Sequence, residues 1–444
     1  MKSVLSLNGM KIPVQNVFGI VVFMSTLLSC GPGRRVASTS PGNAKDISKT
    51  DQFFSQLLES DPFLSDSILK NKDDLRLQII YTQIDRGKKG EPKFTDHYFN
   101  VDTNTYFYPA STVKLPIALL ALQKLHDLNI PGLDRNTTMI TEADYSGQTP
   151  VYNDPTTADG RPTVANYIKK IFLASDNDAF NRLYEFLGQE YINNTLHQMG
   201  YVDAQILHRL NISLSEDQNR HTNPVRFFDA SGKMIYEKPA EFSRLVYASR
   251  NTKLGNGYLS DDKIINEPLD FSKKNRLSLY DLHSIMRSVI FPKAVPANQR
   301  FHLSEDDYAF VRKYMSMFPR ESQYPFYDNT EYSDTYVKFL LFGGAKKWPD
   351  SNIRIFNKPG DAYGFMLDID YVADFKNKIE FMVSAVIYCN SDGILNDDKY
   401  DYETIGHPFY RHLGQVIYNY ELNRKRKHSP DLSSMIFNYA EQNP

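Results

Sequence analysis

The chain has 444 residues, a formal net charge of −2 from 51 Lys and Arg against 53 Asp and Glu, and 41% apolar residues. This balance excludes a nucleic-acid-binding protein, which needs a basic surface, as well as a disordered chain and a protein with many membrane spans. The length is ample for a large core. The composition therefore predicts a folded soluble domain with no nucleic-acid partner.

The N-terminal segment has the pattern of an export signal. Residues 14–28 are apolar and follow two lysines, and the stretch is too short for a permanent membrane span. It ends in Leu27-Leu28-Ser29-Cys30, which resembles the bacterial lipobox, where the cysteine is lipidated and becomes the new N-terminus. The alternative is an ordinary secretory signal with an incidental cysteine.

We expect residues 1–29 to be a lipoprotein signal peptide, Cys30 to be the lipidation site and residues 30–50 to be a polar tether. These expectations place the protein in the cell envelope, lipid-anchored to a bacterial membrane. The domain that follows would lie outside the cytoplasm, in the periplasm or at the surface. Cys389 is the second cysteine, and its apolar surroundings predict a buried, inert thiol.

The first half of the mature chain alternates helical and strand patterns. Apolar residues at helical spacing predict a helix over residues 53–64, and alternation predicts strands over residues 75–84 and 97–101. The long apolar run 115–128 predicts a buried helix. Two or three further helices are expected between residues 163 and 200.

The second half begins with a polar, loop-rich stretch and then returns to regular patterns. We interpret residues 224–275 as an insertion. Beyond it we expect the following elements: helices over 277–290 and 305–317, the latter capped by Ser304; strands over 353–357, 365–372 and 378–389; and a last helix over 403–422.

Strands at both ends of the chain with helices between them predict one α+β domain, residues 51–425, whose sheet combines the two chain ends. A polar tail over residues 426–444 would follow. The basic run 424–427 is interpreted as a solvated helix end, with contact to anionic lipid head groups as the alternative.

Two Ser-x-x-Lys pairs occur, Ser67/Lys70 and Ser111/Lys114, and their contexts separate them. Ser67 lies in a polar stretch, whereas Ser111 opens the most apolar helix, where free backbone N–H groups can receive an oxyanion. A buried Lys114 one turn on, with its pKa lowered, would accept the serine proton. The competing interpretation is an N-capping serine with a surface lysine.

The tripeptide Ser175-Asp176-Asn177 follows a helical stretch and occurs once. Ser175 is a candidate for relaying a proton to a leaving group, and Asn177 for orienting a substrate amide. The same residues would also form an ordinary polar helix N-cap, and both interpretations can hold together.

Lys358-Pro359-Gly360 lies where one predicted strand ends and another approaches. Gly360 would let a substrate backbone lie close to the strand edge, and Lys358 would face the cleft as a positive anchor.

These three motifs, in this order, resemble the set found in class A β-lactamases and penicillin-binding proteins. The resemblance covers residues 50–425 and implies the β-lactamase/transpeptidase-like fold, an antiparallel sheet with a helical subdomain. It also implies roles: Ser111 as acylated nucleophile, Lys114 as general base, Ser175 as proton shuttle, Asn177 as substrate contact and Lys358 as carboxylate anchor. The backbone N–H groups of Ser111 and Asp361, the residue after Gly360, would form the oxyanion hole.

Two departures from the family pattern concern substrate binding and deacylation. Pro359 replaces the usual threonine and offers neither a hydroxyl nor an N–H. At the offset of the family's deacylating glutamate the chain has Arg209-Leu210-Asn211, without a carboxylate. Glu216 and Asp217 are the nearest candidates, or else they belong to a solvated loop.

No cofactor or metal is expected, because the histidines lack ligand spacing, and His407 and His412 are interpreted as packing or surface residues. The motifs predict a serine hydrolase, a monomer acting on β-lactams or related cell-wall amides. Two alternatives remain open: a penicillin-binding-protein-like D-Ala-D-Ala peptidase, and a catalytically idle cell-wall-binding lipoprotein.

Overall fold

The structure is a computed structural model that describes residues 48–440. Cys30, the predicted signal peptide and nearly all of the predicted tether lie outside the described residues. Within residues 48–440, no helix combines the length and apolar character needed to cross a bilayer.

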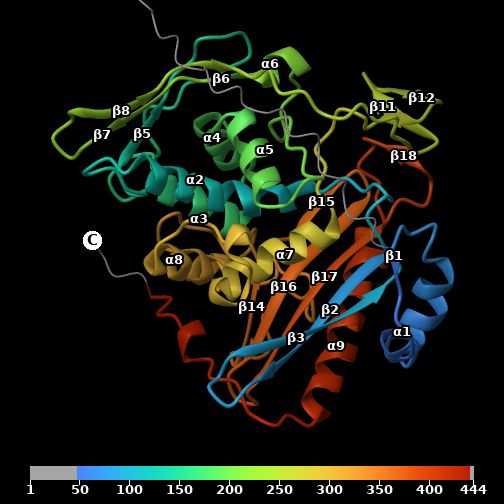
Figure 1. Ribbon diagram of the computed structural model, residues 1–444. Helices are drawn as coiled ribbons and strands as arrows, with labels where there is room; N and C mark the ends of the chain where they lie inside the picture. Colours follow the sequence, from blue (N-terminus) through green and yellow to red (C-terminus); the bar gives the residue numbers. More distant parts are fainter. Residues whose placement is uncertain (1–47, 441–444) are drawn as a thin grey trace, which may run out of the picture. The chain divides into compact units, whose positions relative to one another are not determined.

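A six-stranded antiparallel sheet organises the described domain (Figure 1). Its main path runs β14 (Ile353–Asn357), β16 (Phe365–Asp374), β17 (Ile379–Tyr388), β2 (Gln78–Arg86) and β3 (Pro92–Phe99), and the short β15 (Gly360–Ala362) also pairs with β16. The register places Met382 of β17 opposite Thr82 of β2. The two chain ends therefore meet in the middle of the sheet, as the sequence predicts.

The inner strands β16 and β17 are buried on both faces along almost their whole length, which fits their largely apolar sequences. One face packs against α1 (Gln52–Glu59) and α9 (His407–Asn423), and the other packs against α7 (Leu279–Ile290). Alternate residues of β16 supply the two cores: Leu367 and Ile369 face α7, whereas Met366 faces α9. The predicted α+β architecture is confirmed.

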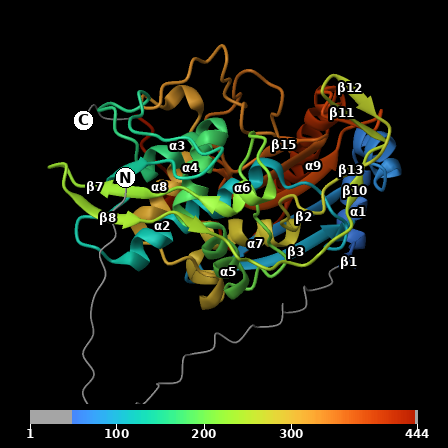
Figure 2. The ribbon, with the colours of Figure 1, turned by 90° about the horizontal axis from the view of Figure 1, so that it is seen from above.

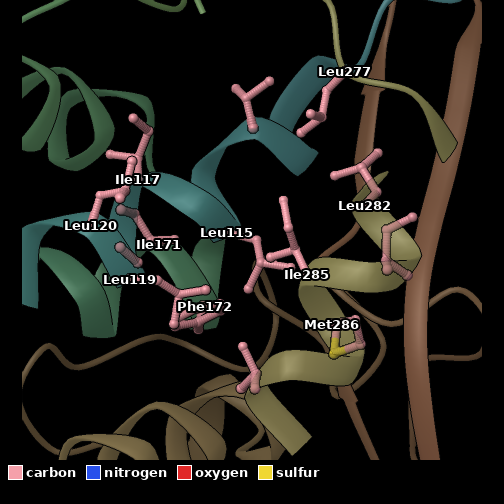
Figure 3. Packing of buried hydrophobic residues seen from close by; sticks show 14 of the residues in the cluster. Leu115, Ile117, Leu119, Leu120, Ile171, Phe172, Leu277, Leu282, Ile285 and Met286 are labelled. Atoms are coloured by element: carbon pink, nitrogen blue, oxygen red, sulfur yellow. The ribbon is translucent and has the colours of Figure 1, made fainter. Parts of the chain in front are cut away.

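A helical region lies on the α7 side of the sheet and carries two of the three candidate motifs, Ser111/Lys114 and Ser175-Asp176-Asn177 (Figures 1 and 2). It contains α2 (Lys114–Leu128), α3 (Val164–Ala174), α4 (Asn177–Leu187), α5 (Gln189–Gln198) and α8 (Glu305–Ser316). Figure 3 shows Leu115 of α2 beside Ile285 of α7 and Phe172 of α3 near Leu119. This packing fixes α2, and hence the residues at its N-terminus, against the sheet.

The predicted insertion 224–275 contains short strands rather than only loops. A hairpin of β7 (Val225–Phe228) and β8 (Met234–Lys238) pairs with β5 (Thr138–Thr141). The insertion also contains β9 (Glu241–Phe242), β10 (Lys253–Leu254), β11 (Gly257–Ser260), β12 (Lys263–Ile265) and β13 (Leu269–Asp270).

Other short elements lie outside the insertion. They are β1 (Ser48–Lys49), β4 (Val101–Asp102), α6 (Glu216–Arg220), β6 (His221–Thr222) and β18 (Ile394–Leu395).

The segment we expected to be a polar tail needs correction for its described part. Leu432 and Met435 are buried in the core, and Tyr439 stacks on the guanidinium of Arg354. Residues up to 440 therefore belong to the folded domain. Few apolar residues are needed for this docking, which is why composition alone did not show it.

Candidate active site

Ser111 lies where the chain enters the helical region. It belongs to a 3-10 turn, Ala110–Val113, that leads directly into α2, so the predicted position at a helix start is confirmed. The residue before it, Ala110, has a φ of 46°, in the left-handed region that residues with a Cβ rarely adopt. Such strain often accompanies functional residues. The other pair differs: Lys70 forms an exposed ion pair with Asp66.

Lys114 is fully buried and joins two of the three motifs. Its Nζ lies 2.7 Å from Ser111 Oγ, 2.7 Å from Asn177 Oδ1, and 2.5 Å from the carbonyl oxygen of Ser175. Ser175 Oγ is 3.3 Å away. The predicted contact between Lys114 and Ser111 is present, and the interpretation of Lys114 as a surface lysine is wrong.

Burial lowers the pKa of Lys114 well below its ordinary value, and the nearby charge of Lys358 lowers it further. A neutral amine has two N–H donors and one lone pair. The Ser175 carbonyl and Asn177 Oδ1 are acceptors that take the two donors, so the lone pair is left for the hydroxyl proton of Ser111. A neutral Lys114 would thus place its lone pair within hydrogen-bond distance of Ser111 Oγ.

The Ser175-Asp176-Asn177 segment joins α3 to α4. Ser175 ends α3 with a φ of 55°, which directs its carbonyl and hydroxyl toward Lys114. Asp176 caps α4 by accepting a hydrogen bond of 2.8 Å from the Ala179 N–H. The helix-cap interpretation is therefore confirmed, and the same segment also contacts Lys114 through Ser175 and Asn177.

Lys358 follows the end of β14 and is fully buried. Its Nζ lies 2.8 Å from Ser175 Oγ and 2.7 Å from the Pro359 carbonyl oxygen. Burial lowers its pKa to about 7, although Asp368 and Asp361 act in the opposite direction. Lys358 thus faces the hydroxyl of Ser175, so that this hydroxyl lies between two buried lysines.

A buried cluster of Lys338, Asn357 and Asp368 holds the residue before Lys358. Lys338 Nζ donates to Asn357 Oδ1 at 2.9 Å, and Asn357 Nδ2 donates to Asp368 at 2.8 Å. Asp368 in turn accepts from the backbone N–H of Phe339 at 2.8 Å. These bonds hold the residue before Lys358 in place, and sequence patterns gave no signal for them.

Gly360 brings β15 against the start of the helix. A Cβ added at Gly360 would lie 2.6 Å from the Ser111 backbone nitrogen and 2.9 Å from that of Thr112, so only glycine fits. The N–H of Lys358 donates to Ile369 of β16, and alternation along the strand then turns the N–H of Asp361 away from β16, toward the open edge. The N–H groups of Ser111 and Asp361 are therefore near each other at this edge.

Glu216 and Asp217 make their contacts elsewhere. The Glu216 carboxylate bonds to Lys273, Tyr247 and Arg220, and the bond from Lys273 contributes most to lowering its pKa to about 2. Asp217 accepts from Tyr145. Among the described residues, no carboxylate bonds to Ser111 or Lys114.

Arg209 is buried and holds the loop in which the deacylating glutamate was sought. It pairs with Glu185 at 2.9 Å and bonds to Asn223 Oδ1 at 3.1 Å. Asn211, which stands at the family offset, is exposed with a φ of 54°.

Histidines and the basic run have mixed roles. His412 pairs with Asp61, as a packing residue would, whereas His407 lines a pocket beside the site and was missed by the sequence interpretation.

Arg424 and Arg426 of the basic run both pair with Glu421. Cys389 is buried, as predicted, and burial raises the pKa of its thiol. Between residues 48 and 440, no cluster of His, Cys, Asp and Glu could hold a metal ion.

Several solved structures resemble the described chain at low sequence identity. A class A β-lactamase from Clostridium kluyveri DSM 555 is 15% identical, with 83% of this chain and 96% of that chain covered and a TM-score of 0.44. A β-lactamase from Sphaerobacter thermophilus DSM 20745 is 12% identical, with 82% of this chain and 94% of that chain covered and a TM-score of 0.41. A variant of PBP-A in an acyl-enzyme complex with penicillin G is 16% identical, with 83% of this chain and 96% of that chain covered and a TM-score of 0.41. Comparison with curated proteins gives no match.

A family model gives the assignment. The model of the β-lactamase enzyme family matches residues 66–300, which is more than half of the 444 residues. The matched region contains Ser111, Lys114, Ser175 and Asn177 and ends before Lys358, whose place in the site follows from its contact with Ser175. The chain belongs to the β-lactamase enzyme family.

Proposed function

We propose that the protein is a serine hydrolase that forms an acyl-enzyme on Ser111. The observation that carries the proposal is the fully buried amine of Lys114 at 2.7 Å from Ser111 Oγ, with two other acceptors for its N–H groups. A surface lysine or a simple helix cap would need neither the burial nor the two acceptors. An amine so placed is a general base for the serine hydroxyl.

In the proposed acylation, Ser111 Oγ attacks a carbonyl carbon and its proton passes to Lys114. The N–H groups of Ser111 and Asp361 stabilise the oxyanion. Ser175 Oγ, which lies 3.3 Å from Lys114 Nζ and 2.8 Å from Lys358 Nζ, passes a proton to the leaving group as the old bond breaks. Asn177 accepts from Lys114 through Oδ1, and its Nδ2 is assigned to a substrate carbonyl.

The substrate classes we propose are β-lactams and D-Ala-D-Ala-type cell-wall peptides. Both contain an amide whose carbonyl would enter the oxyanion site and whose nitrogen would take the proton from Ser175. The mass of the intact protein after exposure to penicillin G tests the proposal. We expect one adduct, absent in Ser111→Ala and present in the matched control Ser67→Ala.

The outcomes separate the alternatives. An adduct that persists in Ser111→Ala contradicts the site assignment. Binding of a cell-wall peptide without any adduct from penicillin or from an activated acyl ester would favour the catalytically idle cell-wall-binding lipoprotein.

A peptidase-like enzyme with slow deacylation is the second candidate. It is favoured by the engagement of Glu216 with Lys273 and Arg220, which leaves no described carboxylate bonded to Ser111 or Lys114. We expect a burst of product equal to the enzyme concentration followed by a slow steady rate. Glu216→Gln should leave both phases unchanged. Rapid steady hydrolysis that this variant abolishes would show that Glu216 is the deacylation base.

We also propose that lipid on Cys30 anchors the protein in the cell envelope. The proposal rests on the lipobox-like sequence before Cys30. Metabolic labelling with a fatty-acid probe tests it, and label that survives Cys30→Ala contradicts it.

A further inference from the structure

A lysine, an asparagine and an aspartate lie in contact at the end of β14, away from solvent. Lys338 and Asp368 are fully buried, and Asn357 is 2% exposed. Lys338 Nζ lies 2.9 Å from Asn357 Oδ1, and Asn357 Nδ2 donates to Asp368 Oδ1 at 2.8 Å. The side-chain amide of Asn357 therefore lies between an amine and a carboxyl group. The proposed acylation on Ser111 uses none of these three side chains.

The amine of Lys338 is placed to act as a nucleophile. Cγ of Asn357 is one carbonyl bond of about 1.2 Å from Oδ1, so it lies at most about 4.1 Å from Lys338 Nζ. The other acceptors around Nζ are the carbonyl oxygens of Met315 at 2.8 Å and Ile355 at 3.1 Å. Burial lowers the pKa of Lys338 to about 7, although Asp368 acts in the opposite direction. When the two carbonyls take the N–H bonds of the neutral amine, its lone pair faces Asn357.

The carboxyl of Asp368 is placed to protonate the amide nitrogen. Burial raises the pKa of Asp368 above its ordinary value. Asp370, two positions further along β16, is also fully buried, and burial together with the charge of Asp368 raises its pKa well above the ordinary value. Two neighbouring buried carboxyls of this kind retain a proton at neutral pH. Asp368 contacts Asn357 Nδ2 directly and can pass that proton to it.

We propose that Lys338 and Asn357 become joined by an intramolecular amide bond, with Asp368 as the catalytic residue. The neutral Nζ attacks Cγ of Asn357, so that the bond from Nζ to Cγ forms and the bond from Cγ to Nδ2 breaks. Nδ2 takes a proton from Asp368 and leaves as ammonia. The proton that Nζ loses restores the Asp368 carboxyl. The products are one amide and one ammonia, and the step needs no oxidant, cofactor or water.

A second lysine–asparagine contact in the same molecule shows what Asp368 adds. Lys114 Nζ lies 2.7 Å from Asn177 Oδ1, which is closer than the contact at Lys338. However, no carboxylate of the described chain bonds to Asn177 Nδ2, and Asn177 is partly exposed. An amide nitrogen without a proton donor is a poor leaving group. We therefore expect no bond between Lys114 and Asn177, and this pair serves as an internal control.

The bond would fix a wall of the proposed active site. The segment 333–346, which contains Lys338, lines a pocket of about 500 Å³ beside Asp361 and contains neither helix nor strand. Asn357 is the residue before Lys358. A covalent bond between Lys338 and Asn357 would attach this wall to the strand end that carries Lys358, and so limit the motion of both. The inference does not depend on acylation of Ser111.

Trypsin digestion of the denatured full chain, followed by mass spectrometry, tests the proposal. Trypsin does not cleave after an acylated lysine, and Pro359 protects the bond after Lys358. The linked product is therefore a branched peptide of residues 321–346 and 355–376. Its mass should be about 17 Da below the sum of the two peptides, because one ammonia is lost. The intact protein should show the same deficit.

The internal control comes from the same digest. The linear peptide of residues 94–114, which ends at Lys114, should appear at its sequence mass. Its presence shows that burial of a lysine beside an asparagine does not by itself block cleavage.

Asp368→Asn isolates the catalytic step, because it keeps the shape of the side chain and removes the proton donor. At least about nine-tenths of the purified variant should give the unlinked peptides 321–338 and 355–376. Asp374→Asn is the matched control. Asp374 is also fully buried on β16 and accepts from an asparagine amide, that of Asn377 at 2.7 Å, and its other side-chain partner is Tyr418. This variant should remain linked.

Each contrary outcome has a distinct meaning. Wild-type peptides 321–338 and 355–376 found only unlinked, at their sequence masses, would overturn the proposal. A mass deficit without the branched peptide would also overturn it, since Asn357 would then have reacted with its own backbone. A branched peptide that is equally abundant in Asp368→Asn would overturn the role of Asp368. The wild-type digest decides whether the bond exists even if Asp368→Asn fails to fold.

Discussion

Gly360→Ala should impair acylation while leaving the fold intact. The added Cβ would meet the backbone nitrogen of Ser111 at 2.6 Å, whereas ordinary contacts begin at 3.4 Å. Because the obstacle is backbone rather than a mobile side chain, β15 must shift by about 0.8 Å, and the N–H of Asp361 moves with it. A displacement of about 1 Å at a reacting centre typically costs about 100-fold in rate. The strain should lower the free energy of unfolding by only about 1–3 kcal/mol.

The assay is the second-order rate constant for acylation by penicillin G or an activated ester, with urea unfolding as the test of the fold. Gly87→Ala is the matched control, since its Cβ meets only the carboxylate end of Glu91, a side chain that can move away. We expect the control to react at the wild-type rate. If Gly360→Ala folds normally and acylates within about threefold of wild type, the close approach of β15 does not position the oxyanion site.

Two further predictions concern buried ionisable groups. Lys114→Met should slow acylation by about 1000-fold or more, because it fills the same space without a base, and an unchanged rate would contradict the assigned role. Asp370 is fully buried beside Asp368, and burial raises its pKa well above the ordinary value, so it stays protonated in the folded state at pH values where the unfolded state ionises. The contribution of Asp370 to the free energy of unfolding should therefore fall as the pH rises above about 4. Asp370→Asn should remove this loss and unfold at equal or higher urea concentration than the wild type near pH 7. A loss of more than about 2 kcal/mol in that variant would refute the argument.

The sheet was predictable because of how it is buried. Strands covered on both faces have continuous apolar sequences, and the predicted strand 353–357 coincides with β14. The last helix was expected from residue 403, but regular α-helix starts at His407 after a wider turn, Tyr402–Gly406. The predicted helix 53–64 likewise ends at Glu59, where Ser60 caps it. Boundaries of this kind depend on tertiary packing that local patterns do not contain.

The site was predictable only as separate motifs. Lys114 and Ser175 are 61 positions apart, and Lys358 and Ser175 are 183 apart, so no local pattern indicates that they touch. The family resemblance supplied their grouping. The pocket beyond Asp361 was not foreseen, because its wall over residues 333–346 has few regular elements and therefore no periodicity.

Lys114 and Lys358 both contact Ser175, and their surroundings indicate which of the two is the base. Two positive charges this close repel each other, so the lysine with the lower pKa loses its proton first. Asp361 favours the protonated form of both lysines, and Asp176 also favours that of Lys114. The contrast comes from Asp368, which favours the protonated form of Lys358, and from Lys358 itself, which disfavours the protonated form of Lys114. Lys358→Met should therefore raise the pKa of Lys114 and move the acid limb of the acylation profile to higher pH, while Lys358→Arg, which keeps the charge, should not. The midpoint of the acid limb does not depend on how far each substitution lowers the maximal acylation rate. Equal midpoints in Lys358→Met and Lys358→Arg would show that Lys358 does not control the protonation of Lys114.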